Sequence, residues 1–209
     1  LGKHLDMDIH CLVTPGYDPI GWAIGPGLEA RETLRILEGN EVSPDLIRKS
    51  VVMAGTMLEM GGKAKKGEGE MMAQQILKNG KALEKMKQII ELQGGDPNVK
   101  AADVHIGDHA VTIKSQRDGR IHYINTQVIS AAARAAGAPR DCGAGIYMYA
   151  EKGDKLKKGQ KIMTIYADAK RKLEAAVELI NKHPPVEMER VILEEMTTED
   201  NTQFLLEFK

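Results

Sequence analysis

The sequence has few of the features that mark membrane-spanning or nucleic-acid-binding proteins. No uninterrupted apolar run reaches the roughly 18 residues that a transmembrane helix needs. The 209 residues include only one Trp, five Tyr and two Phe, so an array of base-stacking rings is not expected. The net charge is −1, which leaves no basic field to hold a phosphate backbone. We therefore expect neither nucleic acid nor a membrane among the partners.

Cysteine is also scarce. The two cysteines, Cys11 and Cys142, are far apart in the sequence and have no CxxC spacing. This pattern favours free thiols in a reducing compartment over a disulfide or a zinc site. No signal-peptide pattern is visible near the start of the sequence. We therefore predict a cytoplasmic location.

The first half of the sequence has the pattern of an α/β domain with part of its sheet missing. An apolar run over residues 9–14, stopped by Pro15-Gly16, predicts a buried strand. Residues 1–5 read as the last turn of a helix directly before it, so the sequence looks cut from a longer one. Ser43 is expected to cap a helix that has Pro44 at its first position. Helical spacing and turn residues predict helices in these places: after the loop 15–27 as far as Gly39, from Pro44 to Gly61, and on both sides of Asn79-Gly80 within 70–93.

Beyond Gly94-Gly95-Asp96-Pro97 the spacing of apolar residues changes from that of helices to that of strands. We place a domain boundary there, with a helix-rich α/β part over 1–97 and a β-rich α+β part over 98–209. The second part is predicted to contain a hairpin of strands 110–114 and 120–124, a helix over 128–136 capped by Asn125, a strand pair (146–150 and 162–166) around Gly153, a helix over 168–181, and terminal strands over 186–194 and 204–208.

Three features could carry chemistry, and each also has a plainer structural interpretation. His105 and His109 could share a metal on a helix, but Gly107 and the nearby aspartates favour a surface loop. The loop 21–27 before a helix could offer N–H groups to an anion, but it lacks the Lys-Ser/Thr ending of a P-loop. The lysines of segment 153–159 could be modified as in a swinging-arm carrier, but they are not presented at a hairpin tip. The structural interpretation is favoured for all three.

Three stretches resemble one enzyme family. Residues 19–30, Pro-Ile-Gly-Trp-Ala-Ile-Gly-Pro-Gly-Leu-Glu-Ala, resemble the loop-to-helix segment of the thymidine/pyrimidine nucleoside phosphorylase family. Residues 80–83, Gly-Lys-Ala-Leu, with Gln-Gly-Gly-Asp-Pro at 93–97, resemble the end of its central α/β domain. Residues 118–138, 143–146 and 153–160 resemble segments of its C-terminal hammerhead domain. The sequence of residues 24–30, with Asp-Cys-Gly-Ala-Gly at 141–145, is most similar to the archaeal branch of the family, which acts on AMP.

The resemblance implies both a fold and an activity. The implied fold is α/β plus α+β: the C-terminal part of the central α/β domain, followed by an α/β-hammerhead, barrel-sandwich-like domain. The implied reaction is a glycosyl transfer in which phosphate attacks C1 of the ribose of AMP, with CMP and UMP as further candidate substrates. The free base leaves, and ribose 1,5-bisphosphate is the other product. The resemblance also implies that the enzyme is a homo-oligomer.

The same resemblance places the family's phosphate-binding and base-binding segments upstream of Leu1. We therefore expect no catalytic, phosphate-binding or base-binding residue in residues 1–209, and no activity from this polypeptide alone. Pyrimidine-type members hold a monovalent cation, and the matching ligands here are the backbone carbonyls of Ile20 and Ala23 and the carboxylate of Glu32. Potassium is the ion expected, with no other cofactor. The plainer interpretation, an ordinary exposed helix residue, is favoured for Glu32, because the archaeal sequence differs around it.

Two other functions stay open from the sequence. One is the phosphorolysis of thymidine or other pyrimidine nucleosides within the same family. The other is a non-enzymatic hammerhead or barrel-sandwich interaction module, which would have no upstream half. A reading frame that continues upstream and contains a glycine-rich phosphate loop would favour the enzyme.

Overall fold

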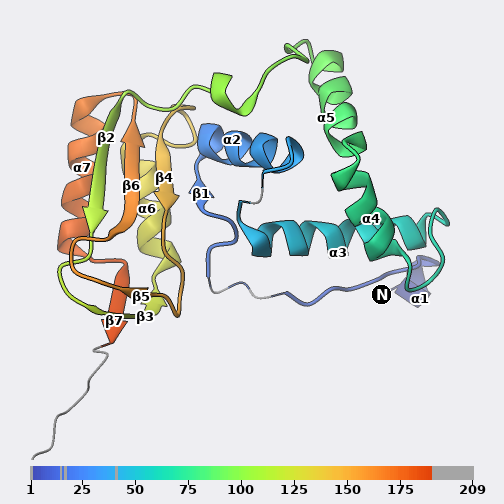
Figure 1. The fold of residues 1–209 in the computed structure, drawn as a ribbon, viewed down its shortest axis with the longest axis horizontal. Coiled ribbons are helices and arrows are strands. Elements are labelled where there is room, and N and C mark those ends of the chain that lie inside the picture. The colour runs from blue at the N-terminus through green and yellow to red at the C-terminus, as the bar shows by residue number, and fades with distance from the viewer. Residues whose placement is uncertain (1, 15, 17, 41, 190–209) are drawn as a thin grey trace, which may run out of the picture.

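A computed structural model describes residues 2–14, 16, 18–40 and 42–189 of the chain. Figure 1 shows two differently built parts, a layer of strands with two helices beside it and a set of helices that extends away from this layer. None of the helices in these described ranges is both long and apolar enough to cross a membrane.

The predicted helices of the first half are present. Gly80, with a φ of 79°, makes the turn predicted between two of them, a backbone conformation that glycine adopts without steric cost. The helices of this half are α1 (Gly2–Leu5), α2 (Pro26–Leu37), α3 (Pro44–Met60), α4 (Gly69–Lys78) and α5 (Lys81–Leu92). A short 3₁₀ turn, η1 (Ala101–Asp103), leads into the second half.

The strand predicted over residues 9–14 is wrong. These residues have no regular secondary structure, and the side chain of Val13 is 100% exposed. A strand is stabilised by hydrogen bonds to a neighbouring strand and by burial of its apolar side chains. No strand in the described part of the chain pairs with residues 9–14, so both sources of stability are missing.

Four strands form the first sheet, in the order β1-β4-β6-β2. All neighbouring pairs are antiparallel, and β4 and β6 form the strand pair predicted around Gly153. The strands are β1 (Ala23–Ile24), β4 (Gly145–Met148), β6 (Lys161–Ala167) and β2 (His109–Lys114). Strand β1 precedes the boundary placed at residue 97 yet pairs with β4 beyond it; the boundary itself stays a prediction.

The second sheet has the order β5-β3-β7 and corrects the predicted hairpin. Its strands are β5 (Lys155–Leu156), β3 (Gly119–Ile124) and β7 (Val186–Glu189). Strands β2 and β3 therefore lie in different sheets, because the backbone of Ser115 stays bonded to the turn before β6, through Gln160 and Gly159. The connection 115–118 crosses between the sheets instead of reversing the chain. The rest of the predicted strand 186–194 and all of 204–208 lie outside the described residues.

Helices α6 (Thr126–Ala136) and α7 (Lys170–Lys182) pack together beside the first sheet. Asn125 caps α6 as predicted, since its Oδ1 accepts hydrogen bonds from the amides of Gln127 and Val128. The core between these helices and the strands includes Ile129, Ile146 and Ile165, which are each at most 1% exposed. The chain is thus a mixed α/β protein with two antiparallel sheets.

Candidate functional site

The loop that precedes α2 is held in place by a buried carboxylate. Glu32 is only 4% exposed, so its interpretation as an ordinary exposed helix residue is wrong. Its Oε1 accepts a hydrogen bond from the amide of Trp22 at 3.0 Å, and its Oε2 accepts a longer one from the amide of Ala23 at 3.4 Å. The side chain of a helical residue leans back toward the helix N-terminus, which is how Glu32 reaches this loop.

Ser43 supplies a third donor to the same carboxylate. Its hydroxyl donates to Oε1 of Glu32, and Ser43 itself is 1% exposed. The predicted helix cap is therefore wrong: Ser43 has a φ of 49° and makes no side-chain hydrogen bond to the first turn of α3. A buried carboxylate is costly unless hydrogen bonds satisfy it, and the hydroxyl of Ser43 supplies one of these bonds.

These contacts bear on the predicted cation ligands without deciding them. Glu32 does lie against the loop that contains Ile20 and Ala23, but the contacts it makes there are with amide N–H groups. Positive amide hydrogens already neutralise part of its charge. The cation at Ile20, Ala23 and Glu32 stays a prediction.

Glycines let α2 and its loop approach the first sheet without intervening side chains. A Cβ on Gly27 would lie 2.5 Å from the carbonyl oxygen of Cys142, whose oxygen accepts the Gly27 amide at 2.9 Å. A Cβ on Gly145 would lie 2.2 Å from the carbonyl oxygen of Ile24. We call the contacts of Gly25, Gly27 and Gly145 the glycine seam. It fixes the N-terminal end of α2 against the edge of the sheet.

Aromatic residues gather beside this seam. The rings of Trp22 and Tyr147 meet edge-on with centroids 6.3 Å apart, and those of Tyr147 and Tyr149 are 5.2 Å apart. Trp22 Nε1 also donates to the carboxylate of Glu151. Burial raises the pKa of the Tyr147 hydroxyl above 10.0, an effect that the nearby charge of Arg35 opposes. Burial likewise raises the pKa of Tyr166.

The other candidates from the sequence have structural roles. His105 lies in a loop, as predicted, with its Nε2 3.0 Å from Oδ1 of Asp168, whereas His109 begins strand β2. In the described ranges no three His, Cys, Asp or Glu side chains lie close enough together to hold a metal. The lysine-rich segment is tied into the second sheet, because Lys155 pairs with Arg120 and the amide of Lys158 donates to Asp118.

Comparison with known proteins shows which family this chain is similar to. Residues 120–187 match the pyrimidine nucleoside phosphorylase C-terminal domain. The resemblance to this phosphorylase family is confirmed. The matched range contains β4, β5, β6, α6 and α7 and all of β3 except Gly119, and these elements together make most of the core.

Longer relatives match nearly the whole chain. The AMP phosphorylase of Pyrococcus horikoshii is 45% identical over 194 residues, which cover 93% of this chain and 39% of that protein. The AMP phosphorylase of Methanosarcina acetivorans is 44% identical over 193 residues, or 92% of this chain and 38% of the relative. That of Thermococcus kodakarensis is 44% identical over 194 residues. The chain therefore spans about two fifths of the length of these relatives.

Proposed function

We propose that this chain forms the C-terminal part of a nucleotide phosphorylase that uses phosphate to cleave AMP. The observation that carries the proposal is the 45% identity over 93% of the chain to an enzyme named AMP phosphorylase. The match to a phosphorylase C-terminal domain over residues 120–187 supports the same reaction class. In this reaction phosphate attacks C1 of the ribose, free adenine leaves, and ribose 1,5-bisphosphate is the product, with CMP and UMP as further candidate substrates.

The part of such an enzyme that this chain supplies is a scaffold. Phosphorolysis passes through a state with oxocarbenium character, so phosphate, sugar and base must be held in a fixed arrangement. The Glu32 network and the glycine seam hold the loop 18–25 and the first turn of α2 against the sheet. We further propose that residues 98–209 form the hammerhead, barrel-sandwich-like domain, and that Ile20, Ala23 and Glu32 bind potassium. The homo-oligomeric state and the cytoplasmic location stay predictions.

A chimera tests the proposed function. The matched stretch of the P. horikoshii AMP phosphorylase is replaced by this chain, and phosphate-dependent release of adenine from AMP is measured. We expect release by the chimera and none by this chain alone, because positioned groups for phosphate and base account for many orders of magnitude in rate.

The choice of substrate separates the candidate functions. A folded chimera that releases thymine from thymidine but no adenine from AMP would assign the nucleoside reaction instead. A folded chimera that is inactive on AMP, CMP, UMP and thymidine would contradict the enzymatic proposal.

A further inference from the structure

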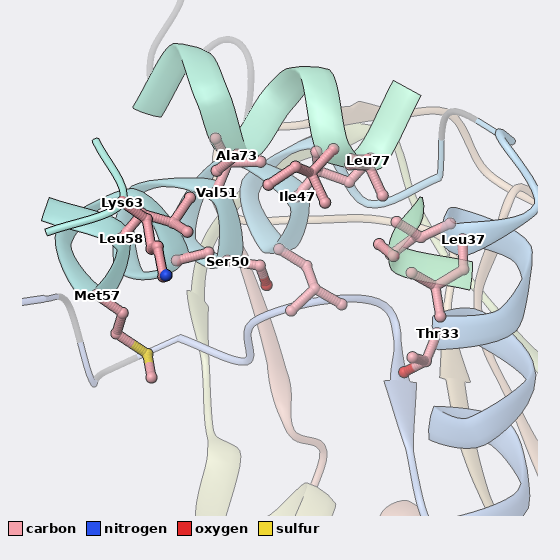
Figure 2. Close-up of a pocket in the computed structure, with 15 residues that line it drawn as sticks. Thr33, Leu37, Ile47, Ser50, Val51, Met57, Leu58, Lys63, Ala73 and Leu77 are labelled. Atoms are coloured by element: carbon pink, nitrogen blue, oxygen red, sulfur yellow. The ribbon is translucent and has the colours of Figure 1, made fainter. Parts of the chain in front are cut away.

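Two of the apolar hollows on the surface differ in what lies beside them. The larger, of about 590 Å³, lies between α2, α3 and α4, and Figure 2 shows Leu37 on one wall and Val51, Ala73 and Leu77 on the others. The smaller, of about 540 Å³, lies between residues 113–117 and residues 184–188, and we call it the β7 groove. The described residues end in β7, on the side of the molecule away from α3 and α4 (Figure 1).

The lining of the β7 groove is continuous with the core of the second half. Three of its residues are buried members of the core cluster: Ile162, Met163 and Ile180. Ile113, Val186 and Met188 also line the groove and pack against the same cluster, but they are only half-buried. An apolar side chain seated in the groove would therefore extend the core and cover apolar surface that the described residues leave open.

Hydrogen bonds hold the two sides of the groove together. The guanidinium of Arg117 donates to the carbonyl oxygen of Met188 at 2.6 Å, and the hydroxyl of Ser115 donates to the sulfur of Met188 at 3.3 Å. The amide of Ser115 in turn donates to the carbonyl oxygen of Gln160 at 2.8 Å. The groove is thus formed before anything occupies it, which lowers the cost of ordering on binding.

The sequence that follows β7 contains an apolar segment of suitable size. Residues 204–208, outside the described residues, read Phe-Leu-Leu-Glu-Phe and include both phenylalanines of the chain. Seven polar residues, 197–203, come directly before them. A cavity of about 150 Å³ holds one benzene ring, so a groove of about 540 Å³ has room for both phenyl rings.

We propose that the β7 groove seats the side chains of Phe204 and Phe208 of the same chain. The link between Glu189 and this segment is residues 190–203, which can span up to about 45 Å. Glu189 adjoins Met188 of the groove lining, so the link starts at the groove itself. A tether of this kind gives a local concentration on the order of millimolar, which favours this occupant over a separate molecule. The proposal concerns this chain by itself and does not rest on the proposed reaction.

Protection of a thiol in the groove tests the proposal. The exposed native thiols Cys11 and Cys142 are first replaced by serine. Asn181 lines the groove and is exposed, so Asn181→Cys places a reactive thiol there. Its rate of reaction with a maleimide is measured in this chain and in the same chain with Phe204→Ser and Phe208→Ser.

We expect the Asn181→Cys thiol to react about tenfold more slowly when both phenylalanines are present, because it then reacts only when the segment leaves the groove. Ala175→Cys, at an exposed position of α7, should react at the same rate in both chains. A chain with Thr198→Ser and Thr202→Ser, which leaves the phenylalanines in place, should keep the slow rate for Asn181→Cys. Equal rates with and without the phenylalanines would overturn the proposal. So would a slow rate that appears only at high chain concentration together with a dimer mass, which would assign the groove to a second copy.

A second measurement leaves both phenylalanines in place and serves if their replacement prevents folding. A nitroxide is attached to Glu207→Cys in the chain without its native thiols. It should broaden the methyl signals of Ile113 and Val186, which line the groove, and not those of Val51 on α3. Sharp signals from Ile113 and Val186 would overturn the proposal.

Discussion

A Cβ atom on Gly21 would lie 2.7 Å from Oε2 of Glu32, so the carboxylate occupies the space that any other side chain would take. This contact, together with the hydroxyl of Ser43, joins the loop before α2 to the start of α3. The network is buried and links three segments that are distant enough in sequence to be independent. Its removal is therefore expected to affect stability strongly.

Glu32→Ala removes the acceptor for the amides of Trp22 and Ala23 and for the hydroxyl of Ser43. Buried donors without a partner destabilise a protein, and we expect a loss of about 3 kcal/mol in the free energy of unfolding. Glu32→Gln keeps one acceptor oxygen and should cost about half as much. Urea unfolding followed by the fluorescence of Trp22, the one tryptophan of the chain, measures both. The exposed Glu91→Gln on α5 is the control, and equal midpoints for all variants would contradict the prediction.

Gly21→Ala should cost more than a substitution that disturbs the backbone alone. Gly21 has a φ of 75° and its added Cβ would meet Glu32, whereas Gly39 has a φ of 89° with nothing within 4 Å. Gly39→Ala is thus a matched control that carries only the strain of a positive φ, about 1 kcal/mol. We expect about 2–3 kcal/mol for Gly21→Ala, because displacement of the carboxylate adds to the strain. A comparison of the two unfolding free energies decides it, and equal losses would show that the contact with Glu32 carries no energy.

Local patterns in the sequence predicted helices, caps and turns better than they predicted which strands pair. Asn125 caps α6 and Gly80 turns the chain between α4 and α5 because both signals act within a few residues. Strand pairing is decided by contacts distant in sequence, which is why β2 pairs with β6 and not with β3. The strand predicted over residues 9–14 was wrong because a strand depends on a neighbour, which its own sequence does not provide.

The sequence likewise predicted one part of the candidate site and missed another. The position of Glu32 on its helix indicated that it could reach the loop, and the family resemblance drew attention to it. Its burial and its bond to Ser43 were missed, since Ser43-Pro44 is the ordinary pattern of a helix cap. The Ser43 hydroxyl bonds Glu32 and not the first turn of α3 because the buried carboxylate needs donors. That burial arises only in the folded chain, so the local sequence around Ser43 does not show it.

Gly145→Ala is expected to open the glycine seam. Its Cβ would lie 2.2 Å from the carbonyl oxygen of Ile24 and 2.9 Å from Cδ1 of Leu28, so backbone must move. We expect a loss of about 3 kcal/mol from overpacking and a separation of β1 from β4. Hydrogen exchange at the amide of Met148, which donates to the carbonyl of Trp22 at 2.7 Å, should become faster. Gly153→Ala, with nothing within 4 Å of its added Cβ, is the control and should leave that exchange rate unchanged.

We expect the tyrosines beside the glycine seam to make the free energy of unfolding fall at alkaline pH. Burial raises the pKa values of Tyr147 and Tyr166 above the ordinary 10.0, so the folded state disfavours their charged forms. The unfolded chain loses these protons at lower pH, so the stabilisation is fully present below about pH 10 and is lost as the pH rises toward the folded pKa values. Absorbance titration should show tyrosines ionising later in the folded chain than in urea.

Substitution identifies which tyrosines are responsible. Tyr147→Phe and Tyr166→Phe should each remove part of the late absorbance change and flatten the fall of unfolding free energy above pH 10. The expected sign follows from the direction of the pKa shifts, because only a raised pKa makes the folded state hold its proton longer than the unfolded state. An unfolding free energy that rises with pH in this range, or that falls equally in the wild-type chain and both variants, would contradict the assignment.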